Sequence, residues 1–302
     1  MKLLEYLKKP SKFFIVLDNF GIIRLSDITK IKLEYKFRFN KKINLKEPKT
    51  FNEKLQWLKL YYRKNEFSTM VDKYDVKDYV GGIIGKEYLI PTLGIYEKFE
   101  DIDFEKLPNQ FVIKCTHDSG SIVICKDKEK FDKKNVRKII NKFMKRKYFY
   151  IHREWPYKNL KPRILIEPFL KDKNNNIGVL DDYKIMCFNG TPKLIELHRN
   201  RGNLNHTQDF YDINWNKTNI KQPEEKMSNI DFKKPETFDL MIKFSEKLSK
   251  NLPHIRVDWY EVNGKLYFGE LTFYDGAGLY PFEPESYDEL LGSWIDLPKS
   301  TK

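Results

Sequence analysis

Two acids on neighbouring strands are the part of this sequence best suited to chemistry. Residues 255–272 read as two strands around an Asn-Gly turn, with Asp258 in the first strand and Glu270 in the second. Side chains alternate between the two faces of a strand, so Arg256 shares a face with Asp258, and Thr272 shares a face with Glu270. The register of the hairpin decides whether these four groups meet.

Two loop lengths are compatible with the turn. A two-residue loop at Asn263-Gly264 would set Asp258 opposite Gly269 and turn Glu270 to the other face. A three-residue loop over residues 262–264, with its glycine in the left-handed conformation, would set the two acids opposite each other. We predict the three-residue loop.

Two carboxylates and a guanidinium on one sheet face need compensation, because like charges a few ångströms apart repel. One or two carboxylates with open positions for water and phosphate describe a magnesium site. The alternative is a surface hairpin with solvated salt bridges. The segment that follows, residues 274–278, has the sequence Tyr-Asp-Gly-Ala-Gly, and its small side chains would let backbone N–H groups approach a ligand.

A second candidate group surrounds Lys114. This lysine ends a strand-like run that begins at Phe111, and the chain then turns through residues 115–120 into a second run over residues 121–125. The lysine precedes its small-residue turn, so the order is not that of a P-loop, and the chain has no Gly-x-Gly-x-x-Gly motif. The order suits a lid that folds over phosphates, although a lysine at a strand end is usually only solvated.

The remaining elements must position these groups. Thr50 and Glu53 form a capping-box pattern at the start of a helix, and a helix over residues 69–79 should stop at Gly81-Gly82 with Lys73 and Lys77 on one side. We also expect helices near residues 133–148 and 236–250, a strand over 163–167 ended by Pro168, and hairpins over 183–198. We predict three units: a mainly helical N-terminal domain (1–100), a lid subdomain (101–167) and a C-terminal subdomain (168–302).

The order of these motifs resembles the ATP-grasp superfamily. More narrowly, five segments are similar to the TupA-like ATP-grasp family of bacterial surface-polysaccharide gene clusters. They are Phe51-Asn52-Glu53-Lys54, Asp72-Lys73-Tyr74, Lys114-Cys115-Thr116-His117-Asp118-Ser119-Gly120, Asp182-Tyr183-Lys184 and Gly269-Glu270-Leu271-Thr272-Phe273. The resemblance covers roughly residues 25–295.

The resemblance implies an α+β, ATP-grasp fold with a helical N-terminal region, a small β-rich lid and a larger C-terminal α+β subdomain, with the nucleotide cleft between the last two. It implies ATP and Mg²⁺ as cofactors. Lys77 and Lys114 would bind the nucleotide phosphates, and the lid loop at Ser119, Gly120 and Ser121 would add contacts to the phosphate oxygens. Lys184 is either a further phosphate contact or a half-exposed strand lysine. The adenine would be held at a hinge formed by Glu167, Pro168, Phe169 and Leu170, where the strand leaves its ladder.

The resemblance also implies the catalytic groups. Asp258 and Glu270 would hold the metal, with Thr272 where many ATP-grasp enzymes have asparagine. Arg256 would stabilise a developing oxyanion together with Lys114, and Gly276 and Gly278 would shape the loop beside an acyl phosphate. His198, Arg199 and Arg201, which follow a predicted strand, could clamp a substrate carboxylate or phosphate, or form a solvated loop. His117 is a candidate proton acceptor.

The activity implied by the resemblance is an ATP-dependent carboxylate-amine ligase of capsule or cell-surface polysaccharide biosynthesis, joining an amino acid to a uronic acid through an acyl phosphate. Three alternatives stay open. A glycosyltransferase would use the Asp-x-Asp match Asp101-Ile102-Asp103, which also reads as part of a solvated acidic connector. An ATP-grasp kinase would phosphorylate a glycan hydroxyl, and a nucleotide-binding scaffold would lack turnover.

Charge and composition bound the partners. The net charge is +13, and residues 1–64 carry most of it. This region suits an acidic glycan, a lipid-linked saccharide or a membrane surface, whereas no nucleic-acid signature is present. No apolar run is long enough to span a membrane, and no secretory signal is complete, so we expect a cytoplasmic protein that can contact the inner face of the membrane. Cys115, Cys125 and Cys187 are expected to be reduced packing residues.

Overall fold

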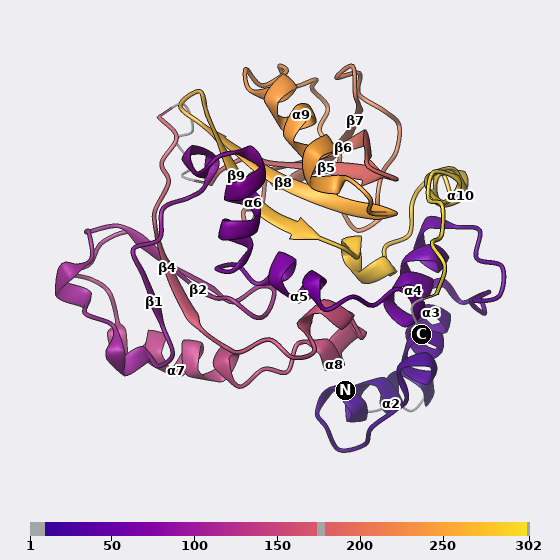
Figure 1. Cartoon of the computed structure of the whole chain (residues 1–302), viewed down its shortest axis with the longest axis horizontal. Helices are drawn as coiled ribbons and strands as arrows, with labels where there is room; N and C mark the ends of the chain where they lie inside the picture. The colour runs from indigo at the N-terminus through magenta and orange to yellow at the C-terminus, as the bar shows by residue number, and fades with distance from the viewer. Residues whose placement is uncertain (1–9, 174–178, 301–302) are drawn as a thin grey trace.

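Two antiparallel sheets face each other across the middle of the molecule (Figure 1). The computed structural model describes residues 10–173 and 179–300. The smaller sheet has the strand order β1-β4-β2-β3, formed by β1 (Gly94–Tyr96), β4 (Ile164–Pro168), β2 (Phe111–Cys115) and β3 (Ile122–Cys125). Helix α7 (Lys133–Met144) covers it, and Val136 and Ile140 of this helix join Phe111 and Ile113 in one buried cluster.

The larger sheet has the strand order β7-β6-β5-β8-β9. Its strands are β5 (Asp182–Phe188), β6 (Thr191–Arg199), β7 (Thr207–Asp212), β8 (His254–Val262) and β9 (Lys265–Thr272). Helix α9 (Phe238–Ser249) packs on one face, where the fully buried Trp259 donates its indole N–H to Ser245 Oγ at 2.9 Å. Burial of such a side chain stabilises the fold by a few kcal/mol, on the order of 2–3.

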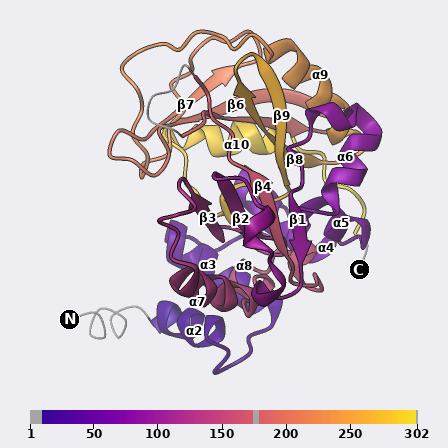
Figure 2. The same cartoon turned by 90° about the vertical axis from the view of Figure 1, so that its left-hand side faces the viewer.

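Helices from the first hundred residues lie beside and beneath the sheets (Figure 2). They are α2 (Pro10–Asn19), α3 (Asp27–Phe39), α4 (Phe51–Tyr61), α5 (Glu66–Val71) and α6 (Val76–Ile84), followed by the 3-10 turns η1 (Lys86–Tyr88), η2 (Phe99–Asp101) and η3 (Phe104–Lys106). Later helical segments are α8 (Phe149–His152), η4 (Trp155–Tyr157), η5 (Asp275–Gly278) and α10 (Ser286–Ser293). No helix of the described residues is long and apolar enough to cross a membrane.

The predicted capping box is confirmed. Thr50 Oγ1 accepts from the Glu53 backbone N–H at 3.2 Å, and the Glu53 carboxylate accepts from the Thr50 N–H at 3.3 Å. Two donors at the start of α4 are therefore satisfied by side chains. The helix predicted over residues 69–79 is wrong in detail: Asp72 accepts from the backbone N–H groups of Tyr74 and Asp75 and ends the first helix. A second helix, α6, then continues through Gly81 and Gly82 to Ile84.

The hairpin pairs its two acids, but by a different device from the one predicted. Val262 pairs with Lys265, so the loop has two residues, and Asn263 and Gly264 both have positive φ (51° and 74°). The three-residue loop is therefore wrong. A β-bulge between Asp258 and Trp259 shifts the register and sets Asp258 opposite Glu270. The extra residue on β9 is a glycine, and a Cβ there would lie 3.0 Å from the Asp258 carbonyl oxygen.

Candidate active site

One face of the larger sheet is apolar and packs on α9, and the other is polar. Across the polar face, Glu270 lies opposite Asp258, Asp258 opposite Lys184, and Lys184 opposite Glu196. These four charged side chains form one row over four strands that are spaced about 4.8 Å apart. A second row sets Asp182 of β5 opposite His198 of β6, which lies opposite Gln208 of β7.

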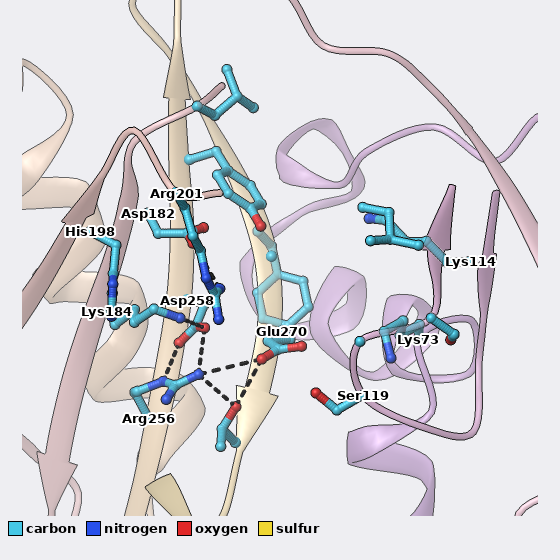
Figure 3. Close-up of a pocket in the computed structure, with 18 of the residues that line it drawn as sticks. Lys73, Lys114, Ser119, Asp182, Lys184, His198, Arg201, Arg256, Asp258 and Glu270 are labelled. Carbon is cyan, nitrogen blue, oxygen red and sulfur yellow. Dashed lines mark hydrogen bonds and ion pairs between the residues drawn. The ribbon is translucent and has the colours of Figure 1, made fainter. Parts of the chain in front are cut away.

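A cleft of about 790 Å³ separates this polar face from the smaller sheet. That volume lies within the range of small-molecule sites. In Figure 3, Lys114, Lys73 and Ser119 stand on one side of the cleft and Glu270, Asp258 and Arg256 on the other. Most of the predicted site residues line it: Lys77, Lys114, Ser119, Gly120, Ser121, Glu167, Pro168, Phe169, Leu170, Lys184, His198, Arg201, Arg256, Asp258, Glu270, Thr272 and Gly276.

Arg256 is the centre of the polar face. Its Nε and Nη2 donate to the two oxygens of Asp258 at 2.7 and 2.8 Å, and its Nη1 donates to Asp275. Nη2 also lies 3.2 Å from Thr272 Oγ1 and 3.4 Å from Glu270 Oε1. Burial by itself would lower the pKa of Arg256, but Asp258 and Asp275 outweigh it and hold that pKa well above its usual value. The guanidinium is permanently charged and fixed in orientation.

The acids differ in what they can offer a cation. Both Asp258 oxygens already accept charged donors, because Lys184 Nζ lies 2.8 Å from Oδ2 beside the Arg256 bonds, and the side chain is almost fully buried. Glu270 is 42% exposed, and described residues reach only its Oε1. A single open carboxylate beside a hydroxyl, facing a cleft wide enough for phosphates, fits Mg²⁺. Glu270 with Thr272 would hold it, and Asp258 orients Arg256 and Lys184 in this arrangement.

Two predicted phosphate ligands share one acid. Glu167 accepts from Lys77 Nζ at 2.5 Å and from Lys114 Nζ at 2.7 Å. Lys77 also donates to Ile90 O at 2.8 Å and Thr92 Oγ1 at 3.0 Å, so all three of its N–H groups are used. Burial lowers the pKa of Lys77, although Glu167 opposes the shift. Of the two lysines, Lys114 is the one with donors left for a phosphate.

The lid loop is tied to a lysine that the sequence reasoning did not assign to the site. Lys73, in the turn between α5 and α6, donates from Nζ to the Asp118 carbonyl, and its backbone N–H donates to Thr116 O at 3.2 Å. Ser119 and Gly120 are exposed, whereas Ser121 is buried and donates to Asp118. A Cβ on Gly120 would meet nothing within 4 Å, so the tip of the loop has room for a ligand.

The residues of the predicted hinge lie together at the end of strand β4. Pro168 is the last residue of β4 to pair with β2, so Phe169 and Leu170 follow the end of the ladder, and all of these residues line the cleft with Glu167. The backbone groups after Pro168 are therefore outside the ladder, as adenine recognition would require. The Glu167 side chain, which was predicted to act only as part of this hinge, is also the counter-ion of both lysines.

Three predicted residues lie outside the cleft lining: Arg199, Gly278 and His117, the last of which is described below. Arg199 pairs with Asp181 at 2.8 Å and stacks on the Phe232 ring, with 4.2 Å between guanidinium carbon and centroid. Gly278 packs on α4, where a Cβ would lie 2.7 Å from the Gln56 amide nitrogen. Gly276 does line the cleft, with φ +52°.

The other candidate substrate residues differ in whether their polar groups are still available to bind a substrate. Arg201 reaches Asp182 at 3.2 Å and remains 59% exposed at the cleft mouth, so it can meet an anion. Both ring nitrogens of His198 have protein partners, Glu196 and His206, which leaves neither for an anion clamp. His117 is buried outside the cleft lining, and neither ring nitrogen has a hydrogen-bond partner in the described chain. Burial lowers the pKa of His117.

Several cleft residues were missed by the sequence reasoning. They include Asp275, Glu196, Gln208 and the buried Glu154, besides Lys73. Glu196 and His198 alternate on β6, so the period-2 pattern that revealed the β8 acids could have found them. Asp275 begins the short 3-10 turn η5 and Glu154 directly precedes η4, and no local pattern signals their approach to the cleft.

A family model described as TupA-like ATPgrasp matches residues 53–296, which is well over half of the chain. The chain belongs to the TupA-like ATP-grasp family. The expected ATP-grasp fold is thereby confirmed, and the mixed helix-and-sheet architecture agrees with it. No curated protein matches significantly.

Solved structures similar to this family member include D-alanine-D-alanine ligase from Bacillus anthracis complexed with ATP (17% identity, TM-score 0.40, covering 68% of this chain and 55% of that one). Another is D-alanyl-alanine synthetase A from Vibrio cholerae (10%, 0.42, 80% and 62%). A third is the ATP-grasp ligase PsnB with precursor, Mg and ADP (10%, 0.39, 74% and 60%). The chain thus spans less than two thirds of the length of each of these proteins.

Proposed function

We propose that this protein is an ATP-dependent, ADP-forming carboxylate-amine ligase. The observation that carries the proposal is the cleft itself, where Lys114 and an open-tipped loop face Glu270, Thr272 and Arg256 across a volume of about 790 Å³. Membership of the TupA-like ATP-grasp family supports the same assignment. Cations on one wall and an open carboxylate on the other are what a metal-bound triphosphate requires.

Each group of cleft residues has its own role in this proposal. Lys114 and the loop at Ser119 and Gly120 would cover the phosphates and exclude water, and residues 167–170 would hold the adenine. Glu270 and Thr272 would hold Mg²⁺, which supplies charge neutralisation for the transferring phosphoryl group. Arg256, fixed by Asp258 and Asp275, would stabilise the oxyanion on the acyl carbon.

The finer setting follows the family resemblance. The carboxylate substrate is proposed to be an acidic glycan or lipid-linked saccharide of capsule or cell-surface polysaccharide biosynthesis, and the first pair to test is a uronic acid with an amino acid. Arg201, exposed at the mouth of the cleft, suits such an acid. Basic residues 1–64, of which 1–9 lie outside the described part, are proposed to contact an anionic membrane surface at its cytoplasmic face.

The Asp-x-Asp match that would support a glycosyltransferase lies away from the cleft. Asp103 caps η3, accepts from the Glu105 N–H at 3.2 Å and pairs with Lys106 at 3.0 Å. Neither Asp101 nor Asp103 lines the cleft. An Asp-x-Asp pair must lie at the nucleotide to hold its metal, so the match at 101–103 is a surface feature.

The proposal is tested by nucleotide preference and then by turnover. Mg-ATP should raise the melting temperature, whereas UDP- or GDP-sugars should not. A panel of uronic acids and amino acids is then screened for ADP release that requires both partners. Requirement for an amine separates a ligase from a kinase that acts on a hydroxyl. Glu270→Gln should abolish ADP release without unfolding the protein, and full activity in this variant would refute the site.

A further inference from the structure

The cleft extends past Arg256 to strands β6 and β7, where its lining changes character. Glu196, Gln208, Gln222 and Glu225 line this end, together with His198. Gln208 donates from Nε2 to Glu196 Oε1 at 2.7 Å and to Gln222 Oε1 at 2.9 Å. The nucleotide scheme uses none of these side chains.

Two acceptors at this end are left without donors. Glu196 Oε2 and Gln208 Oε1 are buried and have no hydrogen-bond partner among the described residues. Both side chains are more than nine-tenths buried, and both line the cleft. A buried acceptor without a donor is destabilising, so a ligand that brings N–H donors would be bound favourably here. A positively charged donor suits Glu196 best.

A chain of two hydrogen bonds and one ion-pair contact leads away from Glu196. His198 Nε2 lies 2.5 Å from Glu196 Oε1, and His198 Nδ1 lies 2.9 Å from His206 Nε2. The two imidazoles are stacked, with 5.1 Å between centroids and 17° between planes. His206 Nδ1 then lies 3.4 Å from Glu225 Oε2. The chain therefore has a carboxylate at each end and two histidines between them.

Proton counting shows what this chain can do. Its two hydrogen bonds and its ion pair together need three protons on the two rings, which means one neutral imidazole and one imidazolium. When both rings are neutral, one of the three contacts has no proton, so a ring nitrogen is free to accept one. The chain can therefore gain one proton at one end and lose one at the other, which is the property of a proton relay.

The relay runs from a buried part of the cleft lining to a partly exposed part of it. Side-chain exposure rises from 5% at Glu196 and 7% at His198 to 22% at His206 and 27% at Glu225. Burial lowers the pKa of His206, and the neighbouring His198 lowers it further, while Glu225 opposes the shift. Arg201 and Asp182 also face His206, and Arg256 and Lys184 face Glu196.

We propose that this end of the cleft binds the substrate amine as its ammonium ion and that the chain Glu196, His198, His206, Glu225 carries one of its protons to solvent. This inference rests on the proposed ligase function. The ammonium ion gives one proton to the relay, and its nitrogen then forms the C–N bond as the acyl C–O bond to phosphate breaks. A second proton leaves on the phosphate as HPO₄²⁻, and the amide keeps the third.

The test uses imidazole NMR on the full-length protein, ¹⁵N-labelled at histidine, with Mg-ADP present. Methylammonium is the probe, and tetramethylammonium, which has the same charge but no N–H donor, is the matched control. We expect saturable shifts of the His198 and His206 nitrogens with methylammonium only. Glu196→Gln and Gln208→Met should each weaken the apparent affinity, Glu196→Gln at least tenfold, whereas the surface variant Glu283→Gln should not.

A pH titration of the same signals tests the relay. We expect the two histidines to take up one shared proton, seen at both rings with one midpoint. Glu225→Gln should move that midpoint to lower pH, because it removes the anion that stabilises the imidazolium. Unsaturable shifts, equal shifts with tetramethylammonium, unchanged affinity in both binding variants or independent titration of the rings would each overturn the proposal. Failure of the ligase function itself would appear separately, as the absence of stabilisation by Mg-ATP or as ADP release that needs no amine.

Discussion

Arg256 should be as important for folding as for catalysis, and replacing it by glutamine tests this. Among the described residues, Arg256 is the only hydrogen-bond donor to Asp275, so the variant leaves Asp275 without one and leaves Lys184 as the remaining cation on Asp258. Both acids are at least nine-tenths buried. Removing one partner of a buried ion pair costs about 3–5 kcal/mol, because the other charge stays buried without compensation. We therefore expect Arg256→Gln to lower the free energy of unfolding by about that amount.

The pH dependence of the loss has a definite sign. Burial alone would raise the pKa of Asp258, but Arg256 and Lys184 outweigh it and hold that pKa below its usual value. A carboxyl with a depressed folded pKa contributes stability above its unfolded pKa of about 3.9, and this contribution is lost as the pH falls. The difference in free energy of unfolding between wild type and Arg256→Gln should therefore become smaller below about pH 4.

Urea denaturation of the two proteins at pH 7 and at about pH 3 measures this difference in the free energy of unfolding. Arg137→Gln is the matched control, because Arg137 pairs with Glu100 at 2.6 Å while both side chains are about half exposed. Such surface pairs contribute about 0–1 kcal/mol. The double variant Arg256→Gln/Asp275→Asn should recover at least about 1 kcal/mol of the loss, since it removes the stranded charge. A loss below 1 kcal/mol for Arg256→Gln, or no recovery in the double variant, would refute the reasoning.

Three further outcomes are expected. Lys114→Met should reduce the rise in melting temperature that Mg-ATP produces. The Lys77 ammonium is bonded within the protein, so Lys77→Met should mainly lower the melting temperature measured without nucleotide. An equal loss of the Mg-ATP effect in both variants would contradict this. Gly276→Ala places a Cβ 2.2 Å from the Tyr280 ring and should lower the free energy of unfolding by more than about 1 kcal/mol. Gly82 lies in helix α6, and a Cβ there would meet nothing within 4 Å, so Gly82→Ala should raise the free energy of unfolding by about 0.5–1 kcal/mol. Denaturant melts measure both changes. Burial raises the pKa of Asp288 to about 6, so ionised Asp288 is destabilising and wild-type stability falls as the pH rises from about 4 to 6. Asp288→Asn should flatten that fall by up to about 3 kcal/mol, and parallel pH profiles of the two proteins would contradict it.

Local rules were sufficient for the elements that depend on neighbours in sequence. The capping box at Thr50, the two strands around Lys114 and the alternation that puts Arg256 and Asp258 on one face follow from spacing alone. The family was also recognisable from short motifs, as the match over residues 53–296 confirms. The helix predicted over residues 69–79 failed because a tertiary contact competes: Arg163 binds both Asp72 and Asp75, which stabilises the break.

Register and counter-ions were decided by the tertiary structure. A bulge at Gly269, rather than the length of the turn, brings Asp258 opposite Glu270, and a spacing rule cannot distinguish the two routes. Glu167 neutralises two lysines that are 90 and 53 residues away in the chain. The sequence by itself therefore determined which residue types the cleft would contain. Only the fold decided which charged side chains form ion pairs within the protein and which remain open to a ligand. This pairing depends on the distances between strands that are far apart in sequence.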